Sequence, residues 1–157
     1  MKRFAGFCLA LPLLQVFAQQ PQPKPAPPSA EEKRQIQSKT DELAAVVRKL
    51  RARHLNEDLL ADLEVYEKAG RMALEFPDEF LAPSDTEHTL AILQTGLERG
   101  RQLESGQSPW TSGKGRRALG MYSALDGSVQ PYGVTLPDSY DGATPARLYV
   151  WMHGRAA

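Results

Sequence analysis

The chain has 157 residues, of which 41% are hydrophobic, and it carries 19 basic and 19 acidic side chains. This length suits one ordinary domain, and the balanced charge gives no electrostatic argument for a nucleic-acid partner. The single cysteine, Cys8, cannot form a disulfide bond within the chain.

Residues 1–18 are predicted to be a secretory signal peptide. Lys2 and Arg3 give a positive start, and residues 4–17 are apolar except at three positions. Val16 and Ala18 are the small side chains that a signal peptidase reads, so we expect cleavage after Ala18. The alternative is a membrane anchor, but the stretch is shorter than the roughly 20 residues that span a bilayer.

Cleavage at this point would change the chemistry of the chain. It would remove Cys8, and with it any thiol nucleophile or thiolate metal site. It would also leave 17 basic side chains against 19 acidic ones. We therefore expect a periplasmic or extracellular protein with no stable membrane insertion and no nucleic-acid partner.

Residues 19–29 are predicted to be a linker, because five of these eleven residues are proline. Proline lacks a backbone donor and favours extended polyproline geometry. We expect a semi-rigid spacer between the export signal and the folded part of the chain.

Residues 30–105 are predicted to form a helical domain of three helices. Ser29 and Glu32 fit a capping box, Asn56 is a second N-cap, and Ser84 is a third. Apolar residues then recur at helical spacing in each segment, at Ile36, Leu43, Val47 and Leu50, at Leu59, Leu60, Leu63 and Tyr66, and at Leu90, Leu93 and Leu97. Short loops between the helices favour an antiparallel unit with one apolar seam.

The charged residues of this helical region do not predict a catalytic or metal site. Glu57 and Asp58 are adjacent on a helix and do not face each other, and acidic residues at a helix start are stabilising in themselves. His54 and His88 have no second ligand at metal spacing. We expect no metal and no organic cofactor.

Residues 106–116 are predicted to be a second linker, followed by a β-hairpin. The strands are expected at residues 119–125 and 128–136, joined by Asp126-Gly127 in a tight turn. Pro131 cannot donate to a sheet ladder, which places its strand near a sheet edge.

Leu148 to Met152 is an unbroken apolar run, typical of a central strand with both faces covered. A central parallel strand needs a crossover of a dozen or more residues to the next strand. We therefore expect an α+β chain as it stands, in which a three-helix unit precedes the first strands of a larger sheet. Residues 117–157 are then the N-terminal fragment of an α/β domain.

The strand half resembles exported bacterial serine hydrolases of the prolyl-oligopeptidase-like group, which have the α/β-hydrolase fold. The residues that carry the resemblance are Tyr122-Ser123, Asp126-Gly127-Ser128, Gln130-Pro131-Tyr132-Gly133, Leu136-Pro137 and Trp151-Met152-His153-Gly154-Arg155. A helical region ahead of the hydrolase domain is also similar to members of that group. The resemblance implies an ester or peptide substrate for a full-length form.

The resemblance assigns a role to the loop after the apolar run. In such enzymes this loop donates a backbone N–H to the oxyanion hole, and the matching residues are Gly154 and Arg155. His153 would shape the loop and not act as the general base; the alternative is an ordinary strand end with a turn glycine. The sequence contains no Gly-x-Ser-x-Gly nucleophile elbow, and Ser123, Asp126 and His153 have no reason to converge as a triad. We therefore expect this chain to be inactive alone.

A second hypothesis needs no catalytic residues. The chain would be a small exported interaction protein, in which the helical unit binds a partner and the exposed strand pairs with another protein's sheet by strand addition.

Overall fold

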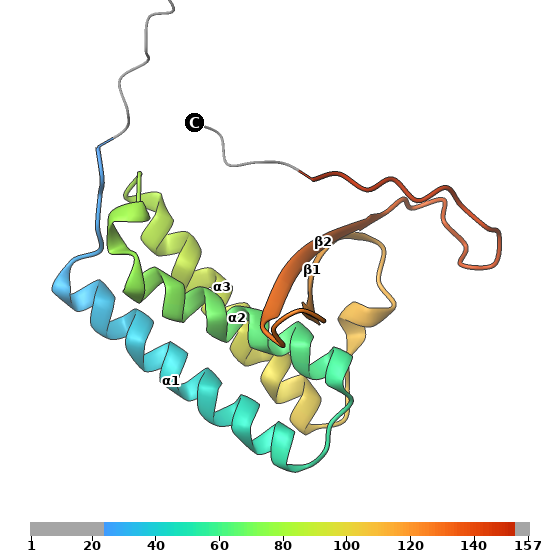
Figure 1. Ribbon diagram of the computed structural model, residues 1–157, viewed down its shortest axis with the longest axis horizontal. Coiled ribbons are helices and arrows are strands. Elements are labelled where there is room, and N and C mark those ends of the chain that lie inside the picture. The colour runs from blue at the N-terminus through green and yellow to red at the C-terminus, as the bar shows by residue number, and fades with distance from the viewer. Residues whose placement is uncertain (1–23, 153–157) are drawn as a thin grey trace, which may run out of the picture.

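The computed structural model describes residues 24–152. Three helices come first, α1 (Ala30–Ala52), α2 (Glu57–Glu75) and α3 (Ser84–Glu104), and the strands β1 (Gly115–Tyr122) and β2 (Val129–Leu136) follow (Figure 1). Single 3-10 turns, Pro77–Glu79 and Pro109–Thr111, precede α3 and β1. This order of helices and strands confirms the predicted α+β class.

The three helices pack on one another and enclose most of the core. Each helix contacts the other two, and α2 also carries the hairpin. The apolar positions predicted from helical spacing supply the buried side chains, with Ile36, Leu43, Leu50, Leu63 and Leu93 the largest fully buried ones. Burying a side chain of this size is worth about 1.5–3 kcal/mol, so this seam is the main source of stability.

Two of the three predicted helix starts are confirmed. The Ser29 side chain accepts from the Glu32 N–H at 3.3 Å while the Glu32 carboxylate accepts from the Ser29 N–H at 2.7 Å. The Asn56 side chain accepts from the N–H groups of Asp58 and Leu59. Both arrangements pair backbone donors that a helix N-terminus leaves without an intrahelical partner.

The third predicted cap is wrong. Ser84 is the first residue of α3, and no side chain caps the helix at Pro83. Instead the Asp85 carboxylate turns back and accepts from the N–H groups of Leu81 and Ala82, at 2.8 and 2.9 Å. These hydrogen bonds lower the pKa of Asp85, because they stabilise its charged form.

The two long helices α1 and α3 end in the same way but with different residues. After α1 the N–H of Leu55 bonds to the carbonyl of Leu50, and His54 adopts φ +55°. After α3 the N–H of Gln107 bonds to the carbonyl of Gln102, and Gly106 adopts φ +77°. This is the Schellman ending, in which the left-handed residue is normally glycine because a Cβ is strained there.

The predicted hairpin is confirmed, but its turn is longer than predicted and β1 begins four residues earlier. The loop closes with a hydrogen bond from the Ser123 N–H to the Ser128 carbonyl at 2.8 Å, and the φ of Gly127 is +71°. The Asp126 carboxylate accepts from both the N–H and the hydroxyl of Ser128. These side-chain hydrogen bonds let four residues turn where the Asp-Gly pair alone predicts two.

The predicted buried strand at residues 148–152 is wrong for this structure. Leu148 to Met152, which we call the apolar segment, forms no strand, and its side chains are 75–92% exposed. The prediction required cover on both faces. The helical unit packs against the hairpin, and the exposure of these five side chains shows that no described element covers them.

Candidate functional site: the hairpin and the apolar segment

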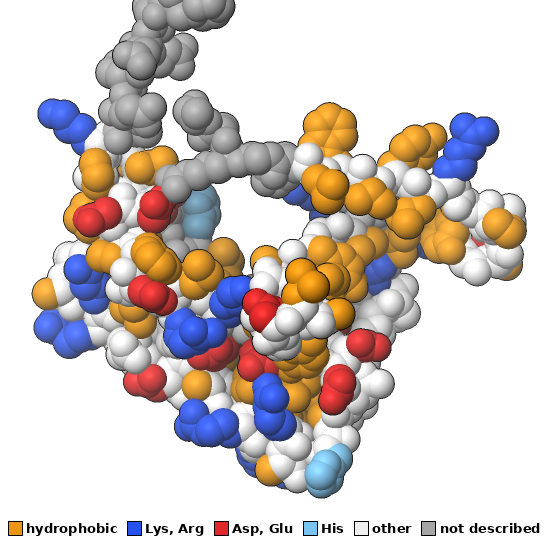
Figure 2. All heavy atoms as spheres, viewed as in Figure 1, with side chains coloured by type: hydrophobic (Ala, Val, Ile, Leu, Met, Phe, Trp, Pro, Cys, Tyr) orange, Lys and Arg blue, Asp and Glu red, His pale blue; other side chains and the backbone are white. Residues whose placement is uncertain are grey.

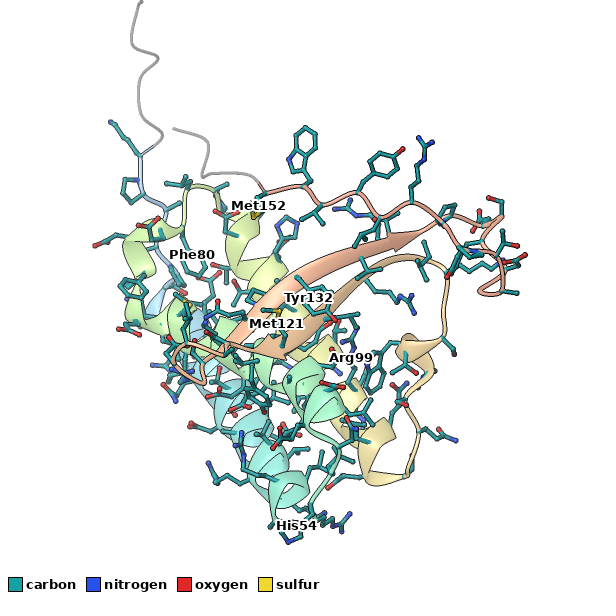
Figure 3. The ribbon with its side chains drawn as sticks, turned by 45° about the vertical axis from the view of Figure 1, so that its right-hand side comes forward. His54, Phe80, Arg99, Met121, Tyr132 and Met152 are labelled. Atoms are coloured by element: carbon teal, nitrogen blue, oxygen red, sulfur yellow. The ribbon has the colours of Figure 1, made fainter. Side chains whose placement is uncertain are left out.

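The predicted site residues Gly154 and Arg155, together with His153, lie outside the described residues. The structure does describe the part of the chain that leads to them, from the hairpin to the apolar segment. Figure 3 shows Met121 and Tyr132 on the hairpin and Met152 above it, at the end of the apolar segment.

The hairpin is fixed to the helical unit by a buried aspartate of α2. Asp62 is 6% exposed, and its two carboxylate oxygens accept different donors. One accepts from the backbone N–H of Gly120 in β1 at 2.8 Å, and the other from the indole N–H of Trp110 at 2.9 Å. A buried carboxylate is stable only when it is paired in this way, so Asp62 positions both the strand and the 3-10 turn before it.

A buried arginine of α3 completes the attachment. The Arg99 guanidinium donates to the carbonyl of Ala118 in β1 at 2.9 Å and to the Asp62 carbonyl at 3.2 Å. It also lies over the rings of Tyr66 and Trp110, at 4.9 and 4.7 Å from their centroids. Burial lowers the pKa of Arg99, and burial raises the pKa of Tyr66. We call Asp62, Tyr66, Arg99 and Trp110 the hairpin anchor.

The contacts of the hairpin anchor can form because β1 packs directly against α2 at Gly120, which has no side chain. A Cβ added to Gly120 would lie 2.0 Å from the backbone oxygen of Ala61. No real Cβ tolerates that distance from a backbone atom, so glycine is required at this position. Gly133 on β2 is different, because a Cβ there would meet nothing within 4 Å.

A second set of contacts holds the turn end of the hairpin. The Tyr122 hydroxyl donates to the Glu64 carboxylate, which also pairs with Arg51 at 2.7 Å. Burial and the hydrogen bond to Glu64 raise the pKa of Tyr122. Lys68 of α2 donates to the Val129 carbonyl at 2.7 Å. The hairpin is therefore attached at both ends of its contact with α2.

These contacts close one edge of the sheet and leave the other edge open. In an antiparallel pair, alternate residues direct their N–H and C=O away from the partner strand. Gly120 and Ala118 are such residues on β1, and the anchor satisfies them. Their partners in the register are Pro131 and Gly133 on β2. Pro131 therefore loses no ladder hydrogen bond, which confirms its predicted edge position.

The outward N–H and C=O groups of Gly133 and Thr135 have no hydrogen-bond partner among the described residues. The apolar segment runs beside this open edge without bonding to it. Two cavities lie beside them: one of 670 Å³ is lined by residues of β1 and β2 and by Trp151, and one of 420 Å³ is lined by β2, the loop after it and residues 146–149. Figure 2 shows hydrophobic side chains exposed along this part of the chain. The surface has what a sheet needs in order to add a strand: free backbone groups and uncovered apolar side chains.

The polar residues of the hairpin turn serve the turn itself. The Ser123 hydroxyl accepts from the Leu125 N–H, and the Asp126 carboxylate is engaged by Ser128, which lowers the pKa of Asp126. Among residues 24–152 no three His, Cys, Asp or Glu side chains cluster closely enough to hold a metal ion. No described helix is long and apolar enough to cross a membrane.

Sequence reasoning missed the hairpin anchor. The available signal was a charged residue on an apolar helix face, since Asp62 lies between Leu60 and Leu63, and Arg99 lies between Leu97 and Gly100. That pattern predicts that a charged side chain is buried, but it does not identify the residues to which that side chain bonds.

Comparison of the chain with protein-family models, with curated proteins and with solved structures finds no match.

Proposed function

We propose that this chain supplies the N-terminal part of an exported serine hydrolase: the helical unit and the first strands of the sheet that carries the active site. The observation that supports this most directly is the open β2 edge beside a fully exposed apolar segment, on a hairpin whose other edge is closed. A hairpin that begins a larger sheet needs one free edge, to which the next strand can add.

The energetics favour further cover for this region. A two-stranded hairpin is marginally stable in water unless it gains strands or packs on another element. Here the helical unit supports one edge, and five consecutive apolar side chains of the apolar segment face solvent. Covering each large one would gain about 1.5–3 kcal/mol. Additional strands and helices would supply that cover.

In this proposal the chemistry lies just beyond the apolar segment. The backbone N–H of Gly154 or Arg155 would stabilise the oxyanion that forms on the substrate carbonyl. The nucleophile, the acid and the base would come from residues outside this sequence, which has no Gly-x-Ser-x-Gly. The chain by itself is expected to hydrolyse neither esters nor peptides.

The first test is to read the encoding gene past codon 157, where we expect an in-frame nucleophile elbow. In the protein it encodes, Arg155→Pro removes the backbone donor, and its matched control Arg155→Ala keeps it. Loss of one oxyanion donor costs about 10²–10³ in kcat, so only the proline variant should lose ester hydrolysis to that degree. A gene without the elbow would overturn the proposal, and equal activities of the two variants would exclude Arg155 as the donor.

The open edge also favours a second candidate, an exported protein that binds a partner by strand addition. Gly133→Pro removes an outward N–H from β2 and leaves the ladder to β1 intact, because that N–H does not point at β1. If residues 19–157 form a soluble, cooperatively unfolding monomer that binds an extended peptide, and Gly133→Pro abolishes the binding, this second function replaces the first.

A further inference from the structure

An apolar pocket lies at the end of the helical unit where α2 gives way to α3. It has a volume of about 510 Å³, which is within the usual range for ligand sites. Its walls are Ala69, Met72, Ala73, Phe76 and Phe80, and its rim includes Glu79, Asp85 and Thr89. Met72 and Phe76 are 44% and 46% exposed, so two large apolar side chains of the wall face solvent.

The α2–α3 side of this pocket is acidic. Between Arg71 and Arg99 the sequence has six Asp or Glu residues and no Lys or Arg. Asp85 at the rim holds its charge, because hydrogen bonds from two backbone N–H groups lower its pKa. Acidic and hydrophobic side chains lie next to one another at this end of the molecule (Figure 2). The pocket therefore suits an occupant that is apolar and positively charged at one end.

The chain's own N-terminus has this chemistry. Residues 1–30 contain Lys2, Arg3 and Lys24 but no acidic residue, and residues 4–17 are the most apolar stretch of the sequence. The 23 residues that precede Lys24 lie outside the described part of the chain, and this apolar stretch is among them.

The chain enters the structure beside the pocket. The Ala26 N–H donates to the carbonyl of Phe80, a pocket wall residue, at 2.6 Å, and Pro28 is buried. Phe80 lies at the opposite end of the helical unit from His54 (Figure 3). Eight residues separate Ala26 from Phe17, and at about 3.1 Å per residue they reach roughly 25 Å. The apolar stretch is thus tethered at the pocket wall with enough chain to fold back onto it.

We propose that the pocket is a docking site for the chain's own N-terminal apolar segment, residues 4–17, with Lys2 and Arg3 facing the acidic rim. In the docked state the apolar side chains of this segment are covered by the helical unit. This inference rests on the helical unit alone and is independent of the hydrolase proposal.

Cys8 provides the test, because it lies in the segment and is the chain's only cysteine. A second cysteine is introduced by Met72→Cys, at a residue that lines the pocket, or by Ile92→Cys, at a residue of α3 outside it that is 42% exposed. The two variants are compared as full chains, at low concentration under mild oxidation. We expect the disulfide bond from Cys8 to the introduced cysteine to form at least tenfold faster in M72C than in I92C. Matched exposure of the two sites removes simple accessibility as a cause.

A second measurement separates docking from chance encounter. Phe76→Gln should slow bridging in M72C several-fold, and changing Lys2 and Arg3 to Glu should slow it at low salt but much less at high salt. Equal bridging rates for M72C and I92C, or dimers through Cys8 as the only product, would overturn the proposal. The outcome does not depend on whether the chain belongs to a hydrolase.

Discussion

The helical unit and the hairpin show two ways in which one chain handles apolar surface. In the helical unit every predicted apolar stripe meets another, and the three helices enclose most of the core. In the hairpin only one edge is closed, by the hairpin anchor, while the outer edge of β2 and the apolar segment face solvent; Val129 alone of β2 is buried in the core. The difference shows that the hairpin has no core of its own: polar contacts position it, together with the few apolar side chains that it packs on the helical unit.

This contrast has a physical consequence. Apolar packing tolerates changes that keep volume, whereas a buried hydrogen-bond cluster fails when one partner is lost. We therefore expect the hairpin to detach through single substitutions that leave the helices folded.

The largest effect is expected for Gly120→Val. Its side chain would overlap the Ala61 carbonyl, which is backbone and cannot move aside, so we expect the hairpin to undock with a loss of about 3 kcal/mol or more. Helical circular dichroism should persist while fluorescence of the buried Trp110 changes. Gly133→Val is the control and should leave urea unfolding unchanged or shift it upward, because that site is open and in a strand. Equal destabilisation by both variants would show that the close approach to α2 is unimportant.

A smaller effect is expected for Asp62→Ala. It leaves the Gly120 N–H and the Trp110 indole N–H buried without an acceptor, which costs about 2–4 kcal/mol. Asp62→Asn keeps one acceptor and should cost about half as much in urea unfolding. If the two variants are equally stable, the two hydrogen bonds do not hold the hairpin.

Alkaline pH should weaken the attachment through Tyr122. Its pKa is raised in the folded protein by burial and by Glu64, so the unfolded chain loses the hydroxyl proton first, near pH 10. The contribution of Tyr122 is therefore complete below pH 10 and is lost as the pH rises through the folded pKa. Tyr122→Phe should lower the free energy of unfolding at pH 7 by about 1 kcal/mol and should flatten its decline above pH 10. An unchanged alkaline decline would assign the effect to another group.

The smallest effects are expected in the helical unit, at the two left-handed helix ends. His54→Gly should stabilise the protein by about 1 kcal/mol, because a Cβ is strained at φ +55°. Gly106→Ala should destabilise it by a similar amount, because that residue has φ +77°. Thermal unfolding measures both changes in stability, and the two variants should shift the unfolding temperature in opposite directions. Changes of the same sign would mean that backbone strain does not govern these sites.

The sequence predicted the parts of this fold that depend on local chemistry. The caps at Ser29 and Asn56, the three apolar stripes and the hairpin around Asp126-Gly127 all follow from residues within one or two turns of each other. The predicted cap at Ser84 is wrong because in this turn the Asp85 carboxylate, and not the Ser84 side chain, accepts hydrogen bonds from backbone N–H groups. The candidate site was less predictable, because Asp62 and Gly120 are 58 residues apart and only the packing of β1 on α2 joins them.

By itself, therefore, the sequence determined the helices, the hairpin and the α+β class, because short-range periodicity and turn chemistry determine them. Only the tertiary structure decided which edge of the sheet is closed and that Leu148 to Met152 stays exposed. An apolar run indicates a tendency to be buried, but burial needs a partner surface. Among the described residues the helical unit gives that surface to the hairpin and not to the apolar segment.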